Sequence, residues 1–412
     1  MSEQVEEVKA PTAGNESVES KISDVVSKLE KNEFNIYFYA PALNSASGGV
    51  GVLFKQAIIL KKAGYNVKVI FEPKVNDRAS HEASMKIQKR VFVYDKFDPS
   101  WLDFDISGLE ILPQVGADEA GNIIKSISFI DSSGAIKEEK VKTIELNTED
   151  IVVIPEGFPN IMQQLANSPC KKVVLAQSWI YILNSLQPGQ TWQSYGISDV
   201  ISVSDAITEY INSVMPGLNI KQYAQSINRE IFNVPEKISD KSPVIAFSCS
   251  RGPENRMKTY NVIRNFQQWH PKNKFVRFVE LNGLSREEYA EMLKSSSIVL
   301  CTDEIAGFGT APLEAMACGS HVVGWAPYGG KEYISENNGF WANNGDIFNL
   351  AEYLGLAVDK LLNGELENPD IQKSYEETLS NYTQEKETET VTNIFKQYVE
   401  ERINEIKGIQ TK

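Results

Sequence analysis

Short apolar runs alternate with segments of helical periodicity along most of this chain, and this alternation constrains the fold more than any other feature. Residues 34–40 have the β-branched and aromatic composition of a strand. Apolar residues then recur at helical spacing over 50–60, Gly64 ends the predicted helix, and 66–71 is the next strand. A strand, a helix and a second strand in this order form the unit from which mostly parallel sheets are built.

The same unit recurs in two series. In the first half, further strands are predicted at 151–155, 171–176 and 199–203, and a β-hairpin is predicted at 123–146. The second half carries predicted strands at 243–249, 275–281, 297–301 and 321–325, with helical patterns between them. Residues 228–242 hold few apolar side chains and are the predicted linker between the two series.

The length of 412 residues exceeds what one hydrophobic core usually supports, so we expect two domains. An acidic flexible tail is expected at 1–33, with a short amphipathic helix over 18–29 as the alternative for part of it. The first domain is expected at 34–235, the second at 240–372, and helices at 373–412 are expected to cross back to the first domain. The predicted fold class is α/β, with two Rossmann-like doubly wound domains facing a central cleft.

Composition argues against several classes of protein. Lys+Arg 41 against Asp+Glu 55 gives a formal net charge of −14, which disfavours a uniformly basic nucleic-acid or membrane binder. The four cysteines lack the paired spacing of a metal site and are typical of reduced core thiols. No apolar run is long enough to cross a bilayer, and the first residues lack a signal peptide, so we expect a cytoplasmic protein.

The most informative motif is a glycine-rich loop that follows a predicted strand and runs into a short helix, at residues 306–319. Free backbone N–H groups and the positive end of the helix suit an anion such as a diphosphate, and Glu314 is placed to accept hydrogen bonds from sugar or ribose hydroxyls. A tight turn with a surface glutamate is the alternative interpretation. The candidate binding residues here are Gly307, Phe308, Gly309 and Thr310.

This run resembles the signature of GT-B glycosyltransferases, most closely the retaining family 4 (glycosyl transferases group 1), whose pattern is Glu-Gly-Phe-Gly-x-x-x-x-Glu-Ala-Met-Ala-x-Gly-x-Pro-Val-Val. The resemblance covers about residues 34–341 and is strongest in the second domain. It implies a GT-B fold and a nucleotide-sugar donor bound by the second domain. Two positions depart from the pattern, because Ala306 stands at the first glutamate, which contacts the donor sugar in the family, and His321 stands at the proline. Asp303 or Glu304 is the alternative acid.

Basic residues follow the first strand of the second domain, at 250–258. A diphosphate leaving group gains charge as the glycosidic bond breaks, and fixed cations stabilise it. The family resemblance implies an Arg and a Lys in this loop: Arg251 matches the Arg, and the Lys place falls on Arg256 by count or on Lys258 by residue type. A solvated basic loop is the alternative. We take Arg251, Lys258 and Glu314 as the candidate catalytic residues.

Two further glycine loops are candidate donor contacts. Gly48, Gly49 and Gly51 follow the first strand of the chain, where their N–H groups could form an anion-binding nest. In the second domain, the resemblance implies that Gly329 and Gly330 also contact the donor and that Glu332 lies near the donor sugar or ribose. Structural turns and a helix-start glutamate are the alternatives.

The sequence offers few acid–base groups. His81 lies in a predicted polar loop, His270 ends a predicted helix and His321 opens a strand, so none is a convincing general base. Glu156 and residues 177–179 end first-domain strands and are candidate acceptor contacts. The Asp-x-Asp at Asp103 and Asp105 is interpreted as structural, and we expect no metal and no cofactor beyond the donor itself.

The predicted function is therefore that of a retaining glycosyltransferase, which moves a sugar from a UDP- or GDP-linked donor to an acceptor that the sequence does not identify. A glycan, a lipid-linked sugar, a protein and a modified nucleic acid all remain open as acceptors. The alternatives are a catalytically silent nucleotide-sugar- or carbohydrate-binding GT-B protein, motivated by Ala306, and a nucleotide-sugar epimerase or a phosphorylase on the same scaffold.

Overall fold

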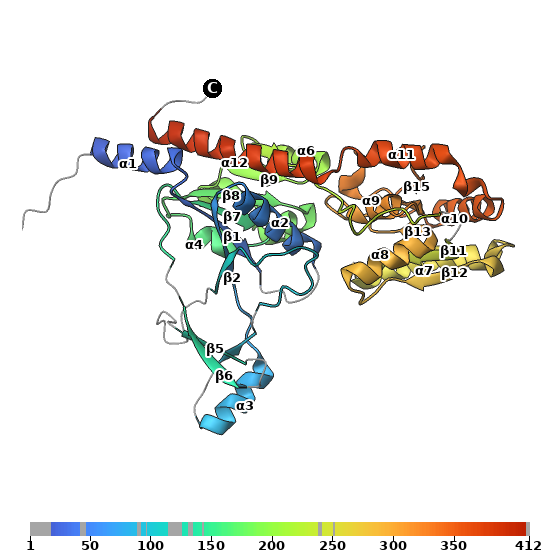
Figure 1. The fold of residues 1–412 in the computed structure, drawn as a ribbon, viewed down its shortest axis with the longest axis horizontal. Helices are drawn as coiled ribbons and strands as arrows, with labels where there is room; N and C mark the ends of the chain where they lie inside the picture. Colours follow the sequence, from blue (N-terminus) through green and yellow to red (C-terminus); the bar gives the residue numbers. More distant parts are fainter. Residues whose placement is uncertain are drawn as a thin grey trace, which may run out of the picture.

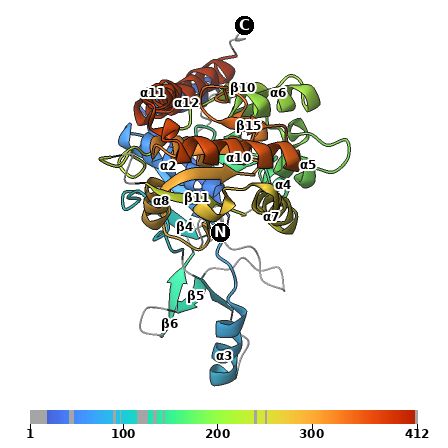
Figure 2. The same ribbon diagram turned by 90° about the vertical axis from the view of Figure 1, so that its right-hand side faces the viewer.

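The computed structural model describes residues 18–41, 47–88, 92–95, 97–113, 126–130, 135–141, 144–237, 241–249 and 252–408. Two parallel sheets dominate it (Figure 1), which confirms the predicted fold class. We call the parts built on them the first lobe and the second lobe. Three strands and a helix form a smaller unit that projects from the first lobe in Figures 1 and 2: β3 (Val93–Tyr94), β5 (Ser126–Ile130), β6 (Ile136–Lys140) and α3 (Asp77–Ile87).

The first sheet has seven strands in the order β10-β9-β8-β7-β1-β2-β4, and all neighbours are parallel. The order reverses direction at β1, whose neighbours are β2 and β7. Its central strands β1, β7 and β8 are almost fully buried, as expected for a sheet covered on both faces. Their bounds are β1 (Asn35–Ala40), β2 (Asn66–Phe71), β4 (Glu110–Pro113), β7 (Ile151–Pro155), β8 (Lys171–Ala176), β9 (Asp199–Ser202) and β10 (Asn219–Gln222).

The second sheet has five parallel strands in the order β12-β11-β13-β14-β15, so its order reverses at β11. The strands are β11 (Ser242–Phe247), β12 (Arg277–Glu280), β13 (Ser296–Cys301), β14 (His321–Trp325) and β15 (Phe340–Ala342). In open α/β sheets, ligands bind outside the carboxyl ends of the strands at the point where the order reverses. The chain offers two such points, β1/β7 and β11/β13.

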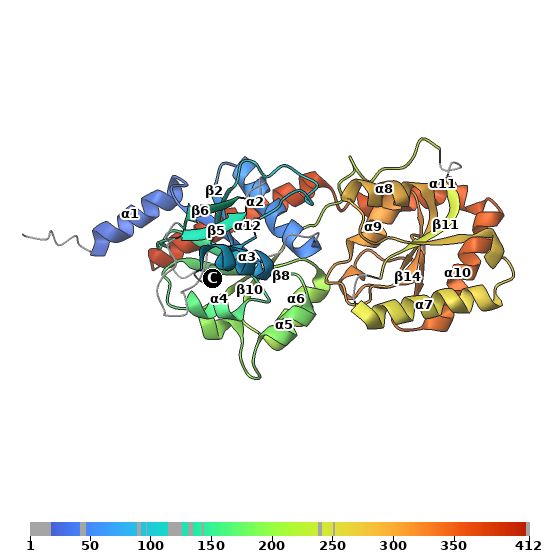
Figure 3. The same cartoon turned by 90° about the horizontal axis from the view of Figure 1, so that it is seen from below.

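Helices surround both sheets, and Figures 2 and 3 show those of the second lobe on either side of its strands. In the second lobe these are α7 (Gly252–Trp269), α8 (Arg286–Ser295), α9 (Thr310–Ala317), α10 (Ile347–Leu362) and α11 (Pro369–Leu379), with short 3₁₀ turns at η3 (Asn273–Phe275), η4 (Tyr328–Gly330) and η5 (Glu365–Glu367). The first lobe has α1 (Val18–Glu30), α2 (Gly48–Lys62), α4 (Pro159–Gln164), α5 (Trp179–Ser185), η1 (Trp192–Tyr195) and α6 (Asp205–Val214).

The last helix, α12 (Gln384–Ile406), follows α11 of the second lobe but packs on the first lobe (Figure 1). Its Phe395 ring lies 6.1 Å from that of Phe38 in β1, and the Tyr398 hydroxyl donates to the carbonyl of Val200 in β9 at 3.1 Å. The helix α1 lies against α12, with Leu29 buried. Residues 18–30, which fall within the expected flexible tail, are therefore helical, as the alternative reading of that segment anticipated.

Candidate active site

The carboxyl ends of β11 and β13 are side by side, because Phe247 pairs with Leu300 in the parallel register. The chain after β11 enters α7, and the chain after β13 leads to the glycine-rich loop. Two hydrogen bonds join these segments: Asn255 Nδ2 donates to the carbonyl of Thr302 at 2.7 Å, and the Thr259 and Thr302 hydroxyls lie 2.6 Å apart. The two most informative motifs of the sequence are thus brought to one edge of the second sheet.

Lys258 in α7 faces the loop that follows β13. Its Nζ forms an ion pair with Glu304 and a second one, at 3.1 Å, with Glu254 one turn earlier. The hydrogen bonds that Lys258 donates to these two carboxylates raise its pKa. Arg251 lies outside the described residues, so its prediction is left without a structural test.

Arg256 points elsewhere. Its guanidinium forms a bidentate pair with Glu280 at the end of β12, at 2.5 and 2.9 Å, and lies 5.0 Å over the ring of Tyr260. Glu280 in β12 lies on the side of β11 away from β13. The structure therefore does not bring Arg256 together with the glycine-rich loop, and of the two alternatives for the Lys place only Lys258 lies there.

The glycines of the second lobe are required by close packing. A Cβ atom at position 307 would lie 1.7 Å from the carbonyl oxygen of Gln177 in the first lobe, and one at position 329 would lie 1.5 Å from the carbonyl oxygen of Gly307. At position 330 a Cβ atom would approach the Tyr333 hydroxyl to 2.5 Å. Gly309 has a φ of +82°, which favours glycine, and precedes Thr310, the first residue of α9. Three loops thus meet at backbone-contact distance.

Phe308 and Ala306 belong to the core. The Phe308 ring is 4% exposed and makes edge contacts with Tyr333 and Tyr382, at 5.6 and 5.5 Å between ring centroids. The side chain of Phe308 is therefore a packing group, which differs from its predicted role as a binding residue. Ala306 is also 4% exposed, so the place of the missing motif glutamate is buried. Of the alternative acids, Glu304 is engaged by Lys258.

The first lobe holds the glycine-rich loop directly. Ser204, which caps α6, donates from its hydroxyl to the Gly307 carbonyl at 2.7 Å. Glu332 Oε2 accepts from the backbone N–H of Asp205, the first residue of α6, at 2.9 Å. Partial desolvation raises the pKa of Glu332. The carboxylate that the sequence predicted beside the donor sugar is therefore bonded to the N-terminus of a first-lobe helix.

Glu314 lies one turn into α9 and is 2% exposed. The buried carboxylate accepts a hydrogen bond of 2.6 Å from Arg286 Nη2, and Arg286 Nε lies 3.4 Å from Asp103 Oδ2 of the first lobe. Sequence reasoning missed Arg286, the first residue of α8, where Ser285 and Glu288 form a capping box. The Asp-x-Asp interpreted as structural supplies one side chain, Asp103, to this contact between the lobes.

The loop after β1 meets the loop after β8. Gly48, Gly49 and Gly51 form the first turn of α2, and Gln177 Nε2 donates to the Gly49 carbonyl at 3.0 Å. Because the Gln177 backbone also packs on Gly307, this one residue contacts the glycine motifs of both lobes.

The other acceptor-side candidates lie close by. Glu156, directly after β7, is 2% exposed, and burial raises its pKa to about 7 against the opposing effect of the nearby Gln177 and Ser178 amides. Glu156 Oε1 has no hydrogen-bond partner among the described residues. The ring of Trp179 lies 5.5 Å from that of Tyr328 in the second lobe, and its buried indole N–H is likewise without a partner in the described part of the chain.

The histidines lie away from these loops. His81 is in α3, not in a polar loop as predicted, because Asn76 caps a helix there. His270 directly follows α7 and stacks on Phe266. His321 opens β14, and burial lowers its pKa to about 4, with the Tyr375 hydroxyl 3.2 Å from its Nδ1. Among the described residues no group of three or more His, Cys, Asp or Glu side chains is arranged to hold a metal.

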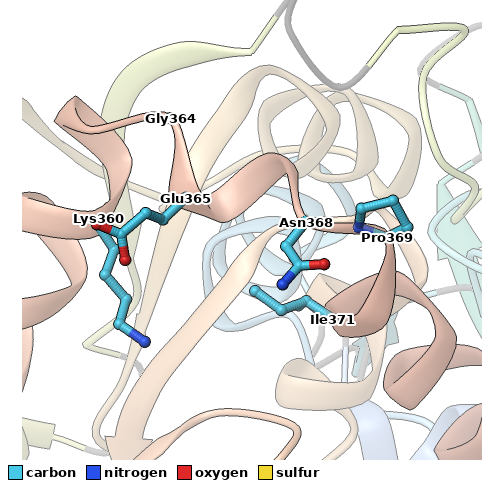
Figure 4. Close-up of a pocket in the computed structure, with 6 residues that line it drawn as sticks. All are labelled: Lys360, Gly364, Glu365, Asn368, Pro369 and Ile371. Carbon is cyan, nitrogen blue, oxygen red and sulfur yellow. The ribbon is translucent and has the colours of Figure 1, made fainter.

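A pocket in the second lobe is lined by the residues shown in Figure 4: Lys360, Gly364, Glu365, Asn368, Pro369 and Ile371. It lies at the opposite edge of the second sheet, because the backbone of the neighbouring Leu366 contacts His321 at the amino end of β14. The glycine loops follow the carboxyl ends, so this pocket is separate from them. In the parts of the chain that the structure covers, no helix is long and apolar enough to span a membrane.

Known proteins share both the sequence motif and the fold. Residues 274–386 match the model of the family described as "Glycosyl transferases group 1". An "Alpha-1,6-glucosyltransferase" of Actinobacillus pleuropneumoniae serotype 7 (strain AP76) is 26% identical over 270 residues, which are 61% of this chain and 76% of that protein.

Solved structures agree over nearly the whole chain. A mutant of S. aureus TarM, in complex with Fondaparinux, alpha-GlcNAc-glycerol and UDP, has a TM-score of 0.57 at 15% identity and covers 89% of this chain and 99% of its own. Anabaena HepE in complex with UDP-glucose has a TM-score of 0.55 at 12% identity, over 88% of this chain and 99% of its own. The two lobes and their loops thus define a glycosyltransferase with the GT-B fold. The match of residues 274–386 to the group 1 glycosyl transferases agrees with the resemblance seen in the sequence.

Proposed function

We propose that this enzyme transfers a hexose from a UDP-linked donor to an acceptor with retention of configuration. UDP as the nucleotide is supported by the TarM and HepE structures, which hold UDP and UDP-glucose. Glucose as the sugar is supported by the name of the bacterial relative. The observation that carries the proposal is the convergence of α7 and the glycine-rich loop at β11/β13, where the strand order reverses.

The donor diphosphate is assigned to this edge. Arg251 and Lys258 supply the cations. The backbone N–H groups of Gly309 and Thr310, at the start of α9, supply hydrogen bonds to the diphosphate. Lys258 is now bound by two carboxylates, so the diphosphate would replace Glu304 or Glu254 as its partner. Glu314 is assigned to hydroxyl groups of the donor. The leaving oxygen of the diphosphate takes the acceptor proton, which requires no general base and no metal.

The acceptor is assigned to the first lobe, beside Gln177 and Trp179. The structure leaves a glycan, a lipid-linked sugar, a protein and a modified nucleic acid open. Four free cysteines, three of which are buried, support a reducing, cytoplasmic location.

The test is a thermal-shift titration with UDP, GDP, UDP-glucose, UDP-N-acetylglucosamine and GDP-mannose, followed by measurement of nucleotide release. A ligand at 100 times its Kd stabilises the folded state by about 2.7 kcal/mol, so the true donor raises the Tm progressively, with the logarithm of its concentration above Kd. We expect UDP and UDP-glucose to do so. Stabilisation by GDP alone would correct the nucleotide, and no response to any of the five would contradict the proposal.

The same samples separate the alternatives. With UDP-glucose alone, a transferase releases UDP slowly and leaves the remaining donor unchanged. Conversion of the donor into a second UDP-sugar would indicate an epimerase, and binding without release in the presence of any acceptor would indicate a silent binding protein.

A further inference from the structure

The side chain of Arg286 connects three parts of the chain that are far apart in sequence. Its Nη2 donates to Glu314 in α9 at 2.6 Å, and its Nε lies 3.4 Å from Asp103 of the first lobe. The guanidinium also lies 4.6 Å over the ring of Phe232, which is in the chain segment that joins β10 to β11. Arg286 is the first residue of α8, and the capping box at Ser285 fixes the start of that helix.

Glu314 needs this contact. At 2% exposure an ionised carboxylate is costly to keep unless a cation and hydrogen bonds compensate for the lost water. Among the described residues, Arg286 is the cation that bonds it. With one oxygen held, the orientation of the carboxylate in α9 is fixed, and its second oxygen remains available to a donor hydroxyl.

The guanidinium is itself held in place. Phe232 is fully buried, and its ring supports the planar face of Arg286 while the edge carries the N–H groups that reach the two acids. A lysine can replace the charge but has one ammonium group where arginine has a fork, so it cannot reach Glu314 and Asp103 with the same geometry.

The contact with Asp103 adds the first lobe to this arrangement. Asp103 precedes β4 and lies in the lobe assigned to the acceptor, whereas Glu314 lies in the lobe assigned to the donor. A change in the distance between the lobes would therefore break one side of the contact while leaving the other intact.

We propose that Arg286 is a positioning residue, which holds the Glu314 carboxylate in the orientation that the donor needs. Through its contact with Asp103, the same side chain also joins the second lobe to the first. This inference rests on the proposed function, because it takes Glu314 as a donor contact. It predicts that the two halves of the contact affect different steps: loss of the Glu314 half weakens nucleotide binding, and loss of the Asp103 half lowers turnover.

The test compares full-length wild type with Arg286→Met, Arg286→Lys and Asp103→Asn. Lys294→Met, which removes a cation paired with Glu291 on the same helix, is the matched control. Calorimetric titration with UDP gives Kd, and UDP release with UDP-glucose gives kcat and KM. We expect Arg286→Met to raise the Kd for UDP at least tenfold, and Arg286→Lys to return it to within about threefold of wild type. Asp103→Asn should leave Kd within about twofold but lower kcat about tenfold, and the control should change neither.

The outcomes are separable from those of the proposed function. If wild type binds neither UDP nor GDP, the proposed function fails, and the ionic contact is then tested by itself through a double-mutant cycle of Arg286→Met and Asp103→Asn in urea unfolding, where additivity overturns it. If wild type binds UDP and Arg286→Met binds it equally well, the positioning role is overturned while the function stands. Should Arg286→Met fail to fold, Asp103→Asn decides: a lower kcat with unchanged Kd supports the contact, and a wild-type kcat overturns it.

Discussion

The carboxyl edges of the two sheets differ in how their charges are arranged. On the second lobe, charged side chains are paired with one another around the β11 and β13 ends: Lys258 with Glu304, Arg286 with Glu314, and Arg256 with Glu280. On the first lobe, the backbone amides of Gln177 and Ser178 meet Glu156, which makes no ion pair among the described residues and has a pKa raised to about 7 by burial.

This difference suits the two substrates of a transferase. An edge that already carries cations can exchange a carboxylate for a diphosphate without exposing new charge, so little desolvation energy is added on binding. An edge of neutral hydrogen-bonding groups suits hydroxyl groups, which are less costly to take out of water than ions. The comparison therefore supports the proposal that the donor binds the second lobe and the acceptor the first, and four predictions test it.

The largest effect is expected from Arg251→Ala. Removal of a cation that stabilises the leaving diphosphate should lower kcat/KM about 10³-fold, or roughly 4 kcal/mol. The control is Arg264→Ala, an exposed arginine of α7, which should behave like wild type. Steady-state release of UDP measures the activity of both variants. Normal turnover by Arg251→Ala would contradict the proposal that the donor binds at this edge.

The contact between the edges is tested by Gly307→Ala. Its Cβ atom would lie 1.7 Å from the Gln177 carbonyl, so the lobes must move apart, and overpacking of this kind costs about 3 kcal/mol. Gly48→Ala is the control, because nothing lies within 4 Å of its Cβ position. Urea unfolding should show a lower midpoint for Gly307→Ala only, and equal midpoints would show that the loops yield freely.

Glu156 tests the neutral character of the first edge. The pKa of Glu156 in the folded state, about 7, lies above the unfolded value, so the folded state binds the proton more tightly. The resulting contribution to the free energy of unfolding is lost as the pH rises through 7. The contribution is complete below about pH 4 and falls by on the order of 2 kcal/mol between pH 5 and 7. Glu156→Gln removes the titration. The difference in unfolding free energy between this variant and wild type should grow from pH 5 to 8; a constant difference would mean that Glu156 is ionised throughout.

The smallest effects distinguish the two basic residues of α7. Lys258→Ala should raise the KM for the donor about tenfold, because Lys258 faces the loop after β13. Arg256→Ala, which breaks a half-exposed pair with Glu280, should change KM less than twofold and leave the unfolding midpoint close to that of wild type. A larger increase of the donor KM in Arg256→Ala than in Lys258→Ala would indicate that Arg256, and not Lys258, contacts the donor.

Much of this architecture could be predicted from the sequence because its signals are local. Apolar runs mark the parallel strands, and the glycine pattern before Glu314 marks the loop that follows β13. Both depend on neighbours within a few residues.

The contacts of the site could not be predicted, because they join residues that are distant in sequence. Nothing near Arg286 indicates that it reaches Asp103, 183 positions away, or that Glu332 caps a first-lobe helix. The glycines were assigned to phosphate binding, whereas position 307 is also constrained by the Gln177 backbone of the first lobe, and position 329 by the Gly307 backbone. Phe308 shows the same limit: its place in the motif indicated a ligand contact, and its packing against Tyr382 is set by the tertiary fold.

The return of α12 to the first lobe means that the polypeptide passes between the lobes twice. The outward and the returning segments touch, since the N–H of Ile227 donates to the carbonyl of Tyr382 at 3.0 Å. Two connections fastened to each other resist twisting far more than bending. We therefore expect opening of the enzyme to be a swing about this seam, which would return the donor edge to the same alignment with the acceptor edge after every turnover.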